Sequence, residues 1–303
     1  FLLSPLTMTR YRNLFSIQKP CVANYSLARF FWMMLLSISP LFLWSQQQFS
    51  SPVEGVLGKS GAADQTPWAF FSNPAGLAYI DQPLAGIGYS SDYHLKELSS
   101  RALFAVVPTK WLVVGGGFVH HGFEHFNYQQ YSVTTSRQMA PWLNLSLRPN
   151  ITVRHQTGIE DRSLFTLDAG LQFQPHDQVK VGFYANNPAQ TRWRFYGEED
   201  EYHPSMVGAA ITYFPSSNVD MELGILKQNL ESAHISFVLS APIHSNVILR
   251  GAVSSAPIRL AFGMGLSWQG FTFDMGMNHH ALLGFSSAFG ITYSLPKVEK
   301  IKD

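Results

Sequence analysis

From about residue 84 to residue 295, apolar residues alternate with polar or small ones. Over 258–268, large apolar residues occupy every second position, and Arg, Ala, Gly and Ser fill the positions between them. The runs 163–174, 270–279 and 284–295 repeat this alternation. Because successive side chains of a strand point to opposite faces, a period of two predicts β-strands with one apolar face. We therefore expect an all-β chain beyond residue 83.

Turn-forming residues divide this region into about fourteen strands of roughly 9–13 residues, the length that a tilted membrane-spanning strand needs. Short breaks near 108, 141, 175, 215 and 242 contain Pro and alternate with more variable breaks, of which 187–203 is the longest. This favours an up-and-down antiparallel barrel with short turns at one rim. Pro149, inside a continuous run, predicts a bulge or an extra turn. We place the strands at 84–91, 99–108, 111–121, 125–138, 141–157, 163–174, 178–187, 203–214, 218–229, 232–241, 246–254, 257–268, 270–279 and 284–295.

The composition indicates that the apolar face meets lipid rather than a protein core. Charged residues make up only 14% of the chain and aromatic residues another 14%. The second face of the strands is rich in Gly, Ala and Ser, unlike a solvated sheet, and many strands begin or end with Trp, Tyr or Phe, as in an aromatic girdle. We predict a transmembrane β-barrel. A soluble fold of two sheets stays open as the alternative, because it also alternates.

An apolar run of 15 residues, 30–44, follows Arg29 and precedes the polar stretch 45–48. The run is short for a transmembrane helix, which needs about 20 residues. A basic flank, a short apolar core and a polar exit are typical of a secretory signal peptide, so 1–45 is predicted to be an N-terminal extension with a signal peptide. An uncleaved anchor is the alternative.

Residues 46–82 do not alternate and contain Gly58, Gly61, Asp64 and the run Asn73-Pro74-Ala75-Gly76-Leu77-Ala78. Asn73 can form an Asx turn, Pro74 fixes φ, and Gly76 permits a tight bend. A compact segment of this kind can sit inside a barrel. We expect it to do so without a hydrophobic core of its own, although a plain turn before the first strand is also consistent with the residues.

The run 58–78 resembles the N-terminal hatch of FadL-type outer-membrane channels, in which a stretch rich in Gly and Ala leads to an Asn-Pro-Ala motif. The form Asn-Pro-Ala-Gly-Leu-Ala is more similar to the PorV/PorQ-like branch, and so are segments 167–188, 207–213 and 283–286. The resemblance implies a hatch at 46–82 built on Asp64, Asn73, Pro74, Ala75 and Gly76, a barrel at 83–295 and a tail at 296–303. It also implies the cell outer membrane as location, with membrane lipid and the outer-membrane insertion machinery as partners.

If the apolar face meets lipid, six charged residues point into the lumen, because charges at the lipid midplane cost about 2–4 kcal/mol each. We expect Asp64 of the hatch to pair with Arg250 or Arg259, because an unpaired buried carboxylate is costly. The six lumen-facing candidates are Asp168, Lys180, Glu222, Arg250, Arg259 and Asp274.

The residues give little reason to expect catalysis, a metal or a cofactor. The neighbouring histidines His120-His121 and His279-His280 point to opposite faces of a strand, so neither pair chelates as it stands. The single cysteine, Cys21, excludes a cysteine-based zinc site. Four basic residues precede residue 46 and no acidic one does, which leaves the rest of the chain mildly acidic and gives no reason to expect nucleic-acid binding.

Two functions follow from the resemblance. One is a subunit of a type IX secretion or surface-attachment apparatus, the role of PorV and PorQ, which works by protein contact. The other is a passive FadL-like channel for a hydrophobic small molecule. An enzyme has no supporting residues in the chain.

Overall fold

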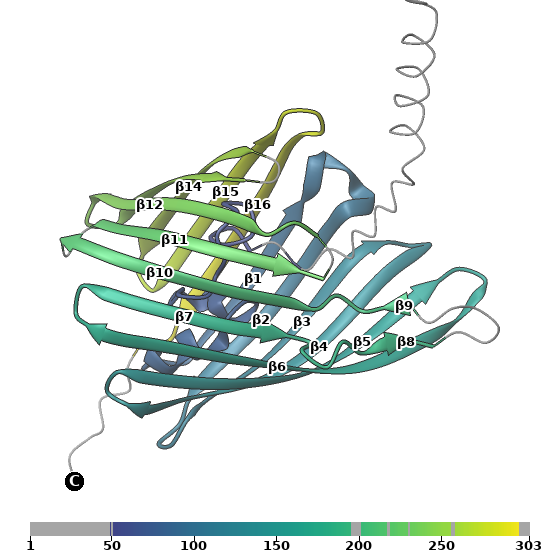
Figure 1. Ribbon diagram of the computed structural model, residues 1–303, viewed down its shortest axis with the longest axis horizontal. Coiled ribbons are helices and arrows are strands. Elements are labelled where there is room, and N and C mark those ends of the chain that lie inside the picture. Colours follow the sequence, from purple (N-terminus) through teal and green to yellow (C-terminus); the bar gives the residue numbers. More distant parts are fainter. Residues whose placement is uncertain are drawn as a thin grey trace, which may run out of the picture. The chain divides into compact units, whose positions relative to one another are not determined.

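The computed structural model describes residues 49, 51–194, 201–216, 219–229, 231–255 and 258–296. Fourteen antiparallel strands close into a barrel, in which each strand pairs with its sequence neighbours and the first pairs with the last (Figure 1). The two-residue strands β8 (Arg192–Trp193) and β9 (Glu201–Tyr202) form a separate small sheet in the connection that follows β7. The predicted all-β, fourteen-stranded up-and-down barrel is confirmed.

The observed strand ends lie within a few residues of the predicted ones. The barrel strands are β1 (Leu84–Ser91), β2 (Ser99–Pro108), β3 (Val113–Phe123), β4 (Phe126–Ala140), β5 (Leu143–Gln156), β6 (Ile159–His176), β7 (Val179–Asn186), β10 (Met206–Ser216), β11 (Val219–Gln228), β12 (His234–His244), β13 (Val247–Ser254), β14 (Arg259–Trp268), β15 (Phe271–His280) and β16 (Gly284–Ser294).

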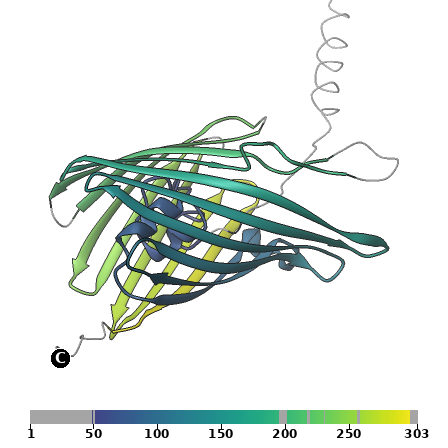
Figure 2. The same cartoon turned by 90° about the horizontal axis from the view of Figure 1, so that it is seen from below.

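The two rims of the barrel differ in the length of their connections. One rim carries short turns together with the start of β1 and the end of β16. The other rim carries the longer connections, including two short 3₁₀ helices, η3 (Asp92–His94) and η4 (Lys96–Leu98), and the segment 187–205. Strands β4 to β6 are the longest and extend beyond β7 at this second rim, where β8 and β9 lie (Figures 1 and 2).

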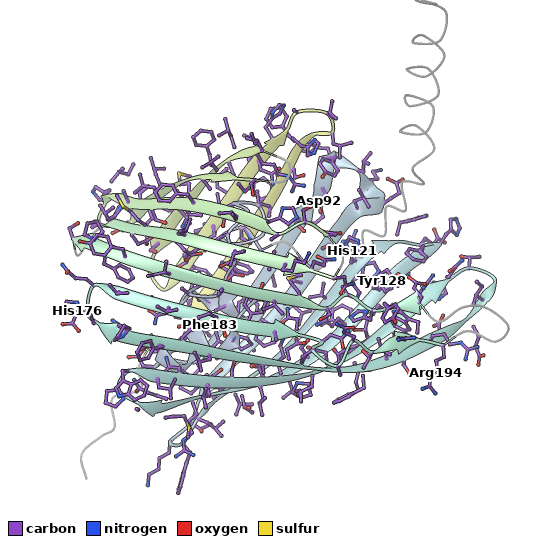
Figure 3. All side chains as sticks on the ribbon, viewed as in Figure 1. Asp92, His121, Tyr128, His176, Phe183 and Arg194 are labelled. Carbon is purple, nitrogen blue, oxygen red and sulfur yellow. The ribbon has the colours of Figure 1, made fainter. Side chains whose placement is uncertain are left out.

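The outer surface of the barrel is apolar and the inner surface is largely polar. Large side chains such as Phe165, Phe183 and Phe262 are 50–69% exposed on the outside, whereas Thr134 and Asn144 are fully buried on the inside. Phe183 points outward from β7 in Figure 3. A soluble two-sheet fold would hide this apolar set in a core, so the closed barrel with its apolar outside is a transmembrane barrel. Among the described residues, no helix is both long and apolar enough to cross a membrane.

Pro149 lies in the middle of β5 and pairs with Leu167 of β6. The predicted bulge or extra turn is wrong, because the register between β4 and β5 is the same on both sides of Pro149: Ser132 faces Asn150, and Thr135 faces Leu147. Proline lacks only the backbone N–H, so the strand passes through it without inserting a residue. The predicted extension and signal peptide (1–45), and almost all of the tail (296–303), lie outside the described residues.

Candidate functional site

Residues 51–82 lie inside the barrel, and we call them the lumen segment (Figure 2). The segment consists of turns and two 3₁₀ helices, η1 (Pro67–Phe70) and η2 (Pro74–Tyr79). Most of its side chains are buried, and Trp68, Asn73, Ala75 and Leu77 have no measurable exposure. The segment therefore fills the middle of the lumen.

Because the lumen segment has little regular secondary structure, its backbone carbonyls need partners from elsewhere. Side chains of the barrel wall supply them. Gln172 Nε2 of β6 donates to Asp64 O at 2.6 Å and to Ala62 O at 3.2 Å, and Asn278 Nδ2 of β15 donates to Val56 O at 2.9 Å. Arg148 of β5 donates to Phe70 O. The wall thus holds the path of the segment by its backbone.

The Asn-Pro-Ala-Gly motif fastens the lumen segment to the wall at strands β6 and β7. Asn73 Oδ1 accepts from Ala75 N at 3.1 Å, which is the expected Asx turn, and Pro74 starts η2. Asn73 Nδ2 donates to Ala62 O at 2.5 Å and to the strand carbonyls of Leu171 at 3.1 Å and Phe183 at 3.3 Å. One amide side chain therefore makes the turn and bonds both strands.

Two glycines let the backbone of the segment approach the wall closely. A Cβ atom at Gly182 of β7 would lie 1.8 Å from Ala62 O, and one at Gly170 of β6 would lie 2.0 Å from Asn73 Oδ1. Any side chain at these positions would push the segment away. Gly76 of the motif is equally confined, with Asp64 O 2.0 Å from the position of a Cβ.

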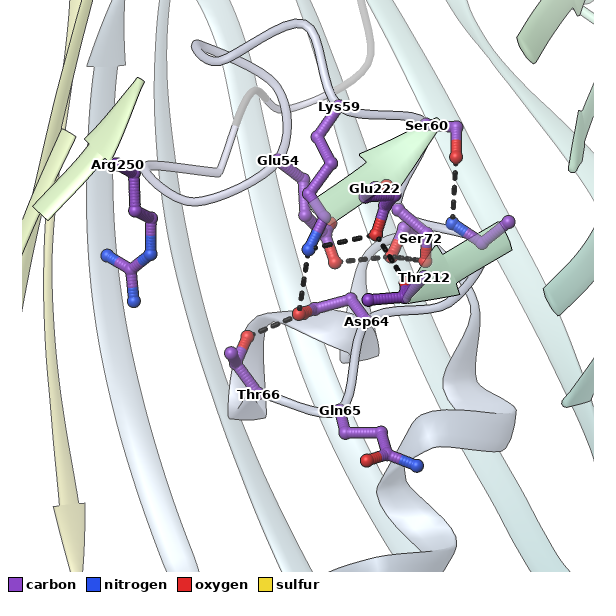
Figure 4. A network of polar contacts seen from close by, with 12 residues as sticks. Glu54, Lys59, Ser60, Asp64, Gln65, Thr66, Ser72, Thr212, Glu222 and Arg250 are labelled. Atoms are coloured by element: carbon purple, nitrogen blue, oxygen red, sulfur yellow. Dashed lines mark hydrogen bonds and ion pairs between the residues drawn. The ribbon is translucent and has the colours of Figure 1, made fainter. Parts of the chain in front are cut away.

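A buried charge network joins the lumen segment to β11. Lys59 Nζ lies 3.1 Å from Glu222 Oε2 and 3.7 Å from Asp64 Oδ1, and the two carboxylates are 1% and 3% exposed. Figure 4 shows both contacts and places Arg250 apart from Asp64. The expected pair of Asp64 with Arg250 or Arg259 is wrong. Lys59, five residues before Asp64 in the same segment, is its ion-pair partner.

The carboxyl group of Glu54 adjoins this network. Ser72 Oγ donates to Glu54 Oε1 at 2.7 Å. Burial and the nearby Asp64 carboxylate raise the pKa of Glu54 well above its ordinary value. Burial also opposes ionisation of Asp64, but Lys59 and a hydrogen bond from Thr66 outweigh it and lower the pKa of Asp64. Of these two carboxyl groups, Glu54 is therefore the one that keeps its proton to the higher pH.

An aromatic cluster fills the lumen on the side of β1 to β3. Trp68, Phe70 and Phe71 of the lumen segment surround Phe104 of β2, with ring centroids 5.3–5.4 Å from it. The segment was expected to pack inside the barrel without a hydrophobic core of its own, and its aromatic residues share their apolar cluster with the inner face of these strands. The other members of the cluster are Phe49, Val53, Ala69, Leu77, Leu84, Ala102, Val106, Val113 and Val119.

The structure places the six lumen candidates on inward-facing positions of their strands. Asp274 accepts from Arg250 Nη1 at 3.0 Å and Asp168 pairs with Arg148 at 2.9 Å, whereas Lys180 Nζ lies 4.9 Å from the Phe214 ring centroid. Glu222 belongs to the Lys59 network. Arg259 is half-buried near the rim of longer connections.

Sequence reasoning missed several residues of this site. Arg148 is only 1% exposed and bonds both the segment and Asp168. Its place in the polar series Asn144, Ser146, Arg148, Asn150 and Thr152 could have revealed it. Lys59 and Glu54 carried no such signal, because the segment has no period from which a direction can be predicted. Among the described residues, no group of three or more His, Cys, Asp or Glu has the geometry of a metal site.

Solved structures similar to this fold include hydrocarbon channels and a FadL homologue. The chain is similar to the Pseudomonas putida toluene transporter TodX at 9% identity and a TM-score of 0.65, over 83% of this chain and all of TodX. It is similar to the monoaromatic hydrocarbon channel CymD (12% identity, TM-score 0.63, 82% of this chain and 98% of CymD). A Pseudomonas aeruginosa FadL homologue matches at 10% identity and a TM-score of 0.60, over 80% and 98% of the two chains.

These likenesses show that the chain has a FadL-type barrel fold. No protein-family model and no curated protein matches the sequence.

Proposed function

We propose that this protein is an outer-membrane channel for a small hydrophobic solute and that the lumen segment is its gate. One observation carries the proposal. The inner face of β1 to β3 is an apolar stripe, which includes Val119 towards the rim of longer connections and Val106 and Val113 towards the opposite rim. The aromatic residues of the lumen segment occupy this stripe. They stand where an apolar solute would pass.

The segment makes polar contacts on one side of the lumen and apolar contacts on the other, as a gate would require. Its hydrogen bonds and ion pairs described above go to β5, β6, β7, β11 and β15. Towards β1 to β3 it presents Phe70 and Phe71, which make apolar contacts. An apolar ring that enters from outside can replace those contacts at little cost, since dispersion and burial are regained with the solute. A small shift of the segment then opens the stripe while the polar side stays anchored.

The fold of TodX and CymD supports this proposal, since TodX transports toluene and CymD is a channel for monoaromatic hydrocarbons. We also propose that the protein lies in the cell outer membrane, with surrounding lipid and the outer-membrane insertion machinery as partners, because a closed barrel with an apolar outside needs lipid around it.

Deletion of residues 51–78 tests the gate. The deletion leaves the strands intact, so the barrel should still fold and migrate anomalously on an unheated gel. In lipid vesicles, toluene uptake should rise severalfold over the full chain. Val106→Asn in the deleted barrel should reduce that rise, because it places an amide on the stripe. Val107→Asn is the matched control, since Val107 is 50% exposed and faces outward. Unchanged uptake after deletion would refute the gate.

A subunit of a secretion or surface-attachment apparatus is the alternative that the PorV/PorQ resemblance implies. It rests on the resemblance of the motif, and the same deletion distinguishes it. If the protein works by protein contact, the deletion should leave permeability unchanged and abolish the capture of a secretion-system protein by the tagged barrel.

A further inference from the structure

A second feature of the lumen lies between the lumen segment and the rim of longer connections. It is a partly enclosed cavity of about 70 Å³. Strands β3 to β7 supply most of its wall, and Phe49, the connection before β10 and Met206 at the start of β10 supply the rest. His121 and Tyr128, which face each other on β3 and β4, are labelled in Figure 3. Its apolar lining includes Phe49, Val119, Pro204 and Met206.

The polar part of the wall is held in place by its own hydrogen bonds. Asn150 Nδ2 donates to Asp168 Oδ2 at 2.8 Å, and Asn150 Oδ1 accepts from Gln130 Nε2 at 3.2 Å. Asn187 N donates to Asp168 Oδ1 at 2.9 Å, and Asn187 Nδ2 donates to His203 O at 3.1 Å. These bonds attach the long connection to the strands and fix the shape of the cavity.

The cavity carries no uncompensated charge. Asp168 is its one acidic lining residue, and the guanidinium of Arg148, at an inward-facing position of β5, pairs with it. Burial lowers the pKa of His203, in the connection before β10, to about 4, so its imidazole is neutral at physiological pH. A charged ligand would lose its hydration without gaining an opposite charge, so the wall favours a neutral one.

Two buried polar atoms of the lining have no hydrogen-bond partner among the described residues. They are Thr152 Oγ1 and His203 Nδ1. Thr152 is 3% exposed and shares the inward-facing positions of β5 with Arg148 and Asn150. A buried polar group without a partner is unfavourable, so a ligand that supplies the partner should bind about tenfold more tightly than one that does not.

The volume limits the size of the ligand. A water molecule needs about 10–15 Å³ of such cavity volume, so the cavity has room for about five to seven water-sized atoms or groups. A six-membered ring with one substituent has seven heavy atoms. The lining therefore fits one small ring with an apolar body and a single hydrogen-bonding group.

We infer that this cavity is a binding site for a small, neutral, hydroxylated ring compound, a phenol rather than a hydrocarbon. The inference rests on the proposed channel function and narrows its solute class. The hydroxyl group can accept a hydrogen bond from Thr152 or donate one to His203 Nδ1, while the ring contacts Phe49, Val119 and Met206.

Binding of phenol and toluene to the purified full chain in detergent tests the site. The two probes have equal numbers of heavy atoms and differ by a hydroxyl in place of a methyl group. Trp193 is a built-in reporter, because its ring centroid lies 6.4 Å from that of Tyr128 and 5.9 Å from that of His203. We expect quenching of its fluorescence, absent in Trp193→Phe, and about tenfold tighter binding of phenol than of toluene. Benzoate should bind more weakly than phenol.

Thr152→Val removes the hydroxyl at nearly constant volume. It should bring the ratio of phenol to toluene affinity close to one by weakening phenol binding. Thr134→Val is the matched control, since Thr134 is a fully buried lumen threonine of β4 outside the cavity. The comparison of phenol and toluene on the unaltered protein needs no variant. It can therefore refute the inference even if a variant misfolds.

Equal affinity for phenol and toluene, or binding of neither, would overturn the inference. The proposed channel fails separately, by the vesicle measurement. Phenol binding without any gate-dependent uptake would retain the site and reject the channel. Gate-dependent toluene uptake with no preference for phenol would reject the site and retain the channel.

Discussion

Trp68 Nε1 of the lumen segment donates a hydrogen bond of 3.0 Å to Asp274 Oδ2 of β15. The other carboxylate oxygen of Asp274 accepts from Arg250 Nη1 at 3.0 Å. One buried carboxylate of the barrel wall therefore accepts hydrogen bonds from a tryptophan of the segment and from an arginine of the wall. The contact joins the aromatic cluster to the polar side of the lumen.

Asp274→Ala should lower the free energy of unfolding by about 3 kcal/mol, because it leaves the Arg250 charge buried and unpaired. Trp68→Phe should cost about 1 kcal/mol from the lost hydrogen bond alone. Urea unfolding in lipid vesicles, followed by heat-modifiable gel migration, measures both. Asp177→Ala, in the exposed turn between β6 and β7, is the control and should have no effect. A larger loss for Trp68→Phe than for Asp274→Ala would contradict this account.

Lys59→Met should release the lumen segment, because Glu222 and Asp64 would then lie buried without a cation. We expect faster protease cleavage within 51–82 and increased toluene uptake in vesicles. Adding Glu222→Met should partly restore both, since it removes one of the uncompensated charges. Lys110→Met, at an exposed position in the turn after β2, serves as the control. Additive effects of the two lumen substitutions would show that the ion pair does not hold the segment.

The lumen segment should bind the barrel interior less tightly as the pH rises above about 4.5, the ordinary pKa of Glu54. The pKa of Glu54 is raised in the barrel, so with rising pH the released segment loses its proton before the bound segment does, and the equilibrium shifts towards release. The lowered pKa of Asp64 acts in the opposite direction, but only below its ordinary value of 3.8. Hydrogen-exchange protection factors of 51–82, measured between pH 5 and pH 9, check this. Glu54→Gln should weaken the dependence, and a decrease in protection towards pH 5 would refute it.

Gly182→Ala should displace the lumen segment without harming the barrel. The new Cβ would lie 1.8 Å from Ala62 O, a backbone atom, so the segment has to shift. Increased toluene uptake and protease cleavage within 51–82, with normal heat-modifiable migration, are the expected results. Gly116→Ala is the control, because nothing lies within 4 Å of a Cβ at that outward-facing position of β3. Equal behaviour of the two variants would mean that the close approach at Gly182 is not needed.

The rim of short turns should face the periplasm, because both ends of the barrel lie on it. Single cysteines at Ser216 and Glu231, in a background with Cys21→Ser, test the orientation. A membrane-impermeant thiol reagent added to intact cells should label the variant at position 231 and spare the one at position 216. The reverse labelling would invert the topology.

The sequence alone determined the barrel. A strand period of two needs no tertiary information, because alternate side chains must meet lipid on one face and the lumen on the other. The Asx turn at Asn73 was equally predictable, since a side chain that bonds the backbone two residues on is a local property. Strand number and closure followed from the turns, and the inward placement of Asp168, Glu222 and Asp274 followed from parity.

The partners inside the lumen depend on how distant parts of the chain come together. Residues 51–82 have no period, so nothing in their sequence predicts that Lys59 faces Glu222 or that Phe70 and Phe71 pack on Phe104. The pairing of Asp64 with Lys59 rather than Arg250 depends on the path of the segment, which wall side chains such as Gln172 and Asn278 set from more than 100 residues away. The cavity at Thr152 likewise exists only because Asn187 attaches the long connection to Asp168. Contacts between distant segments depend on the closure of the barrel, so local sequence patterns do not predict them.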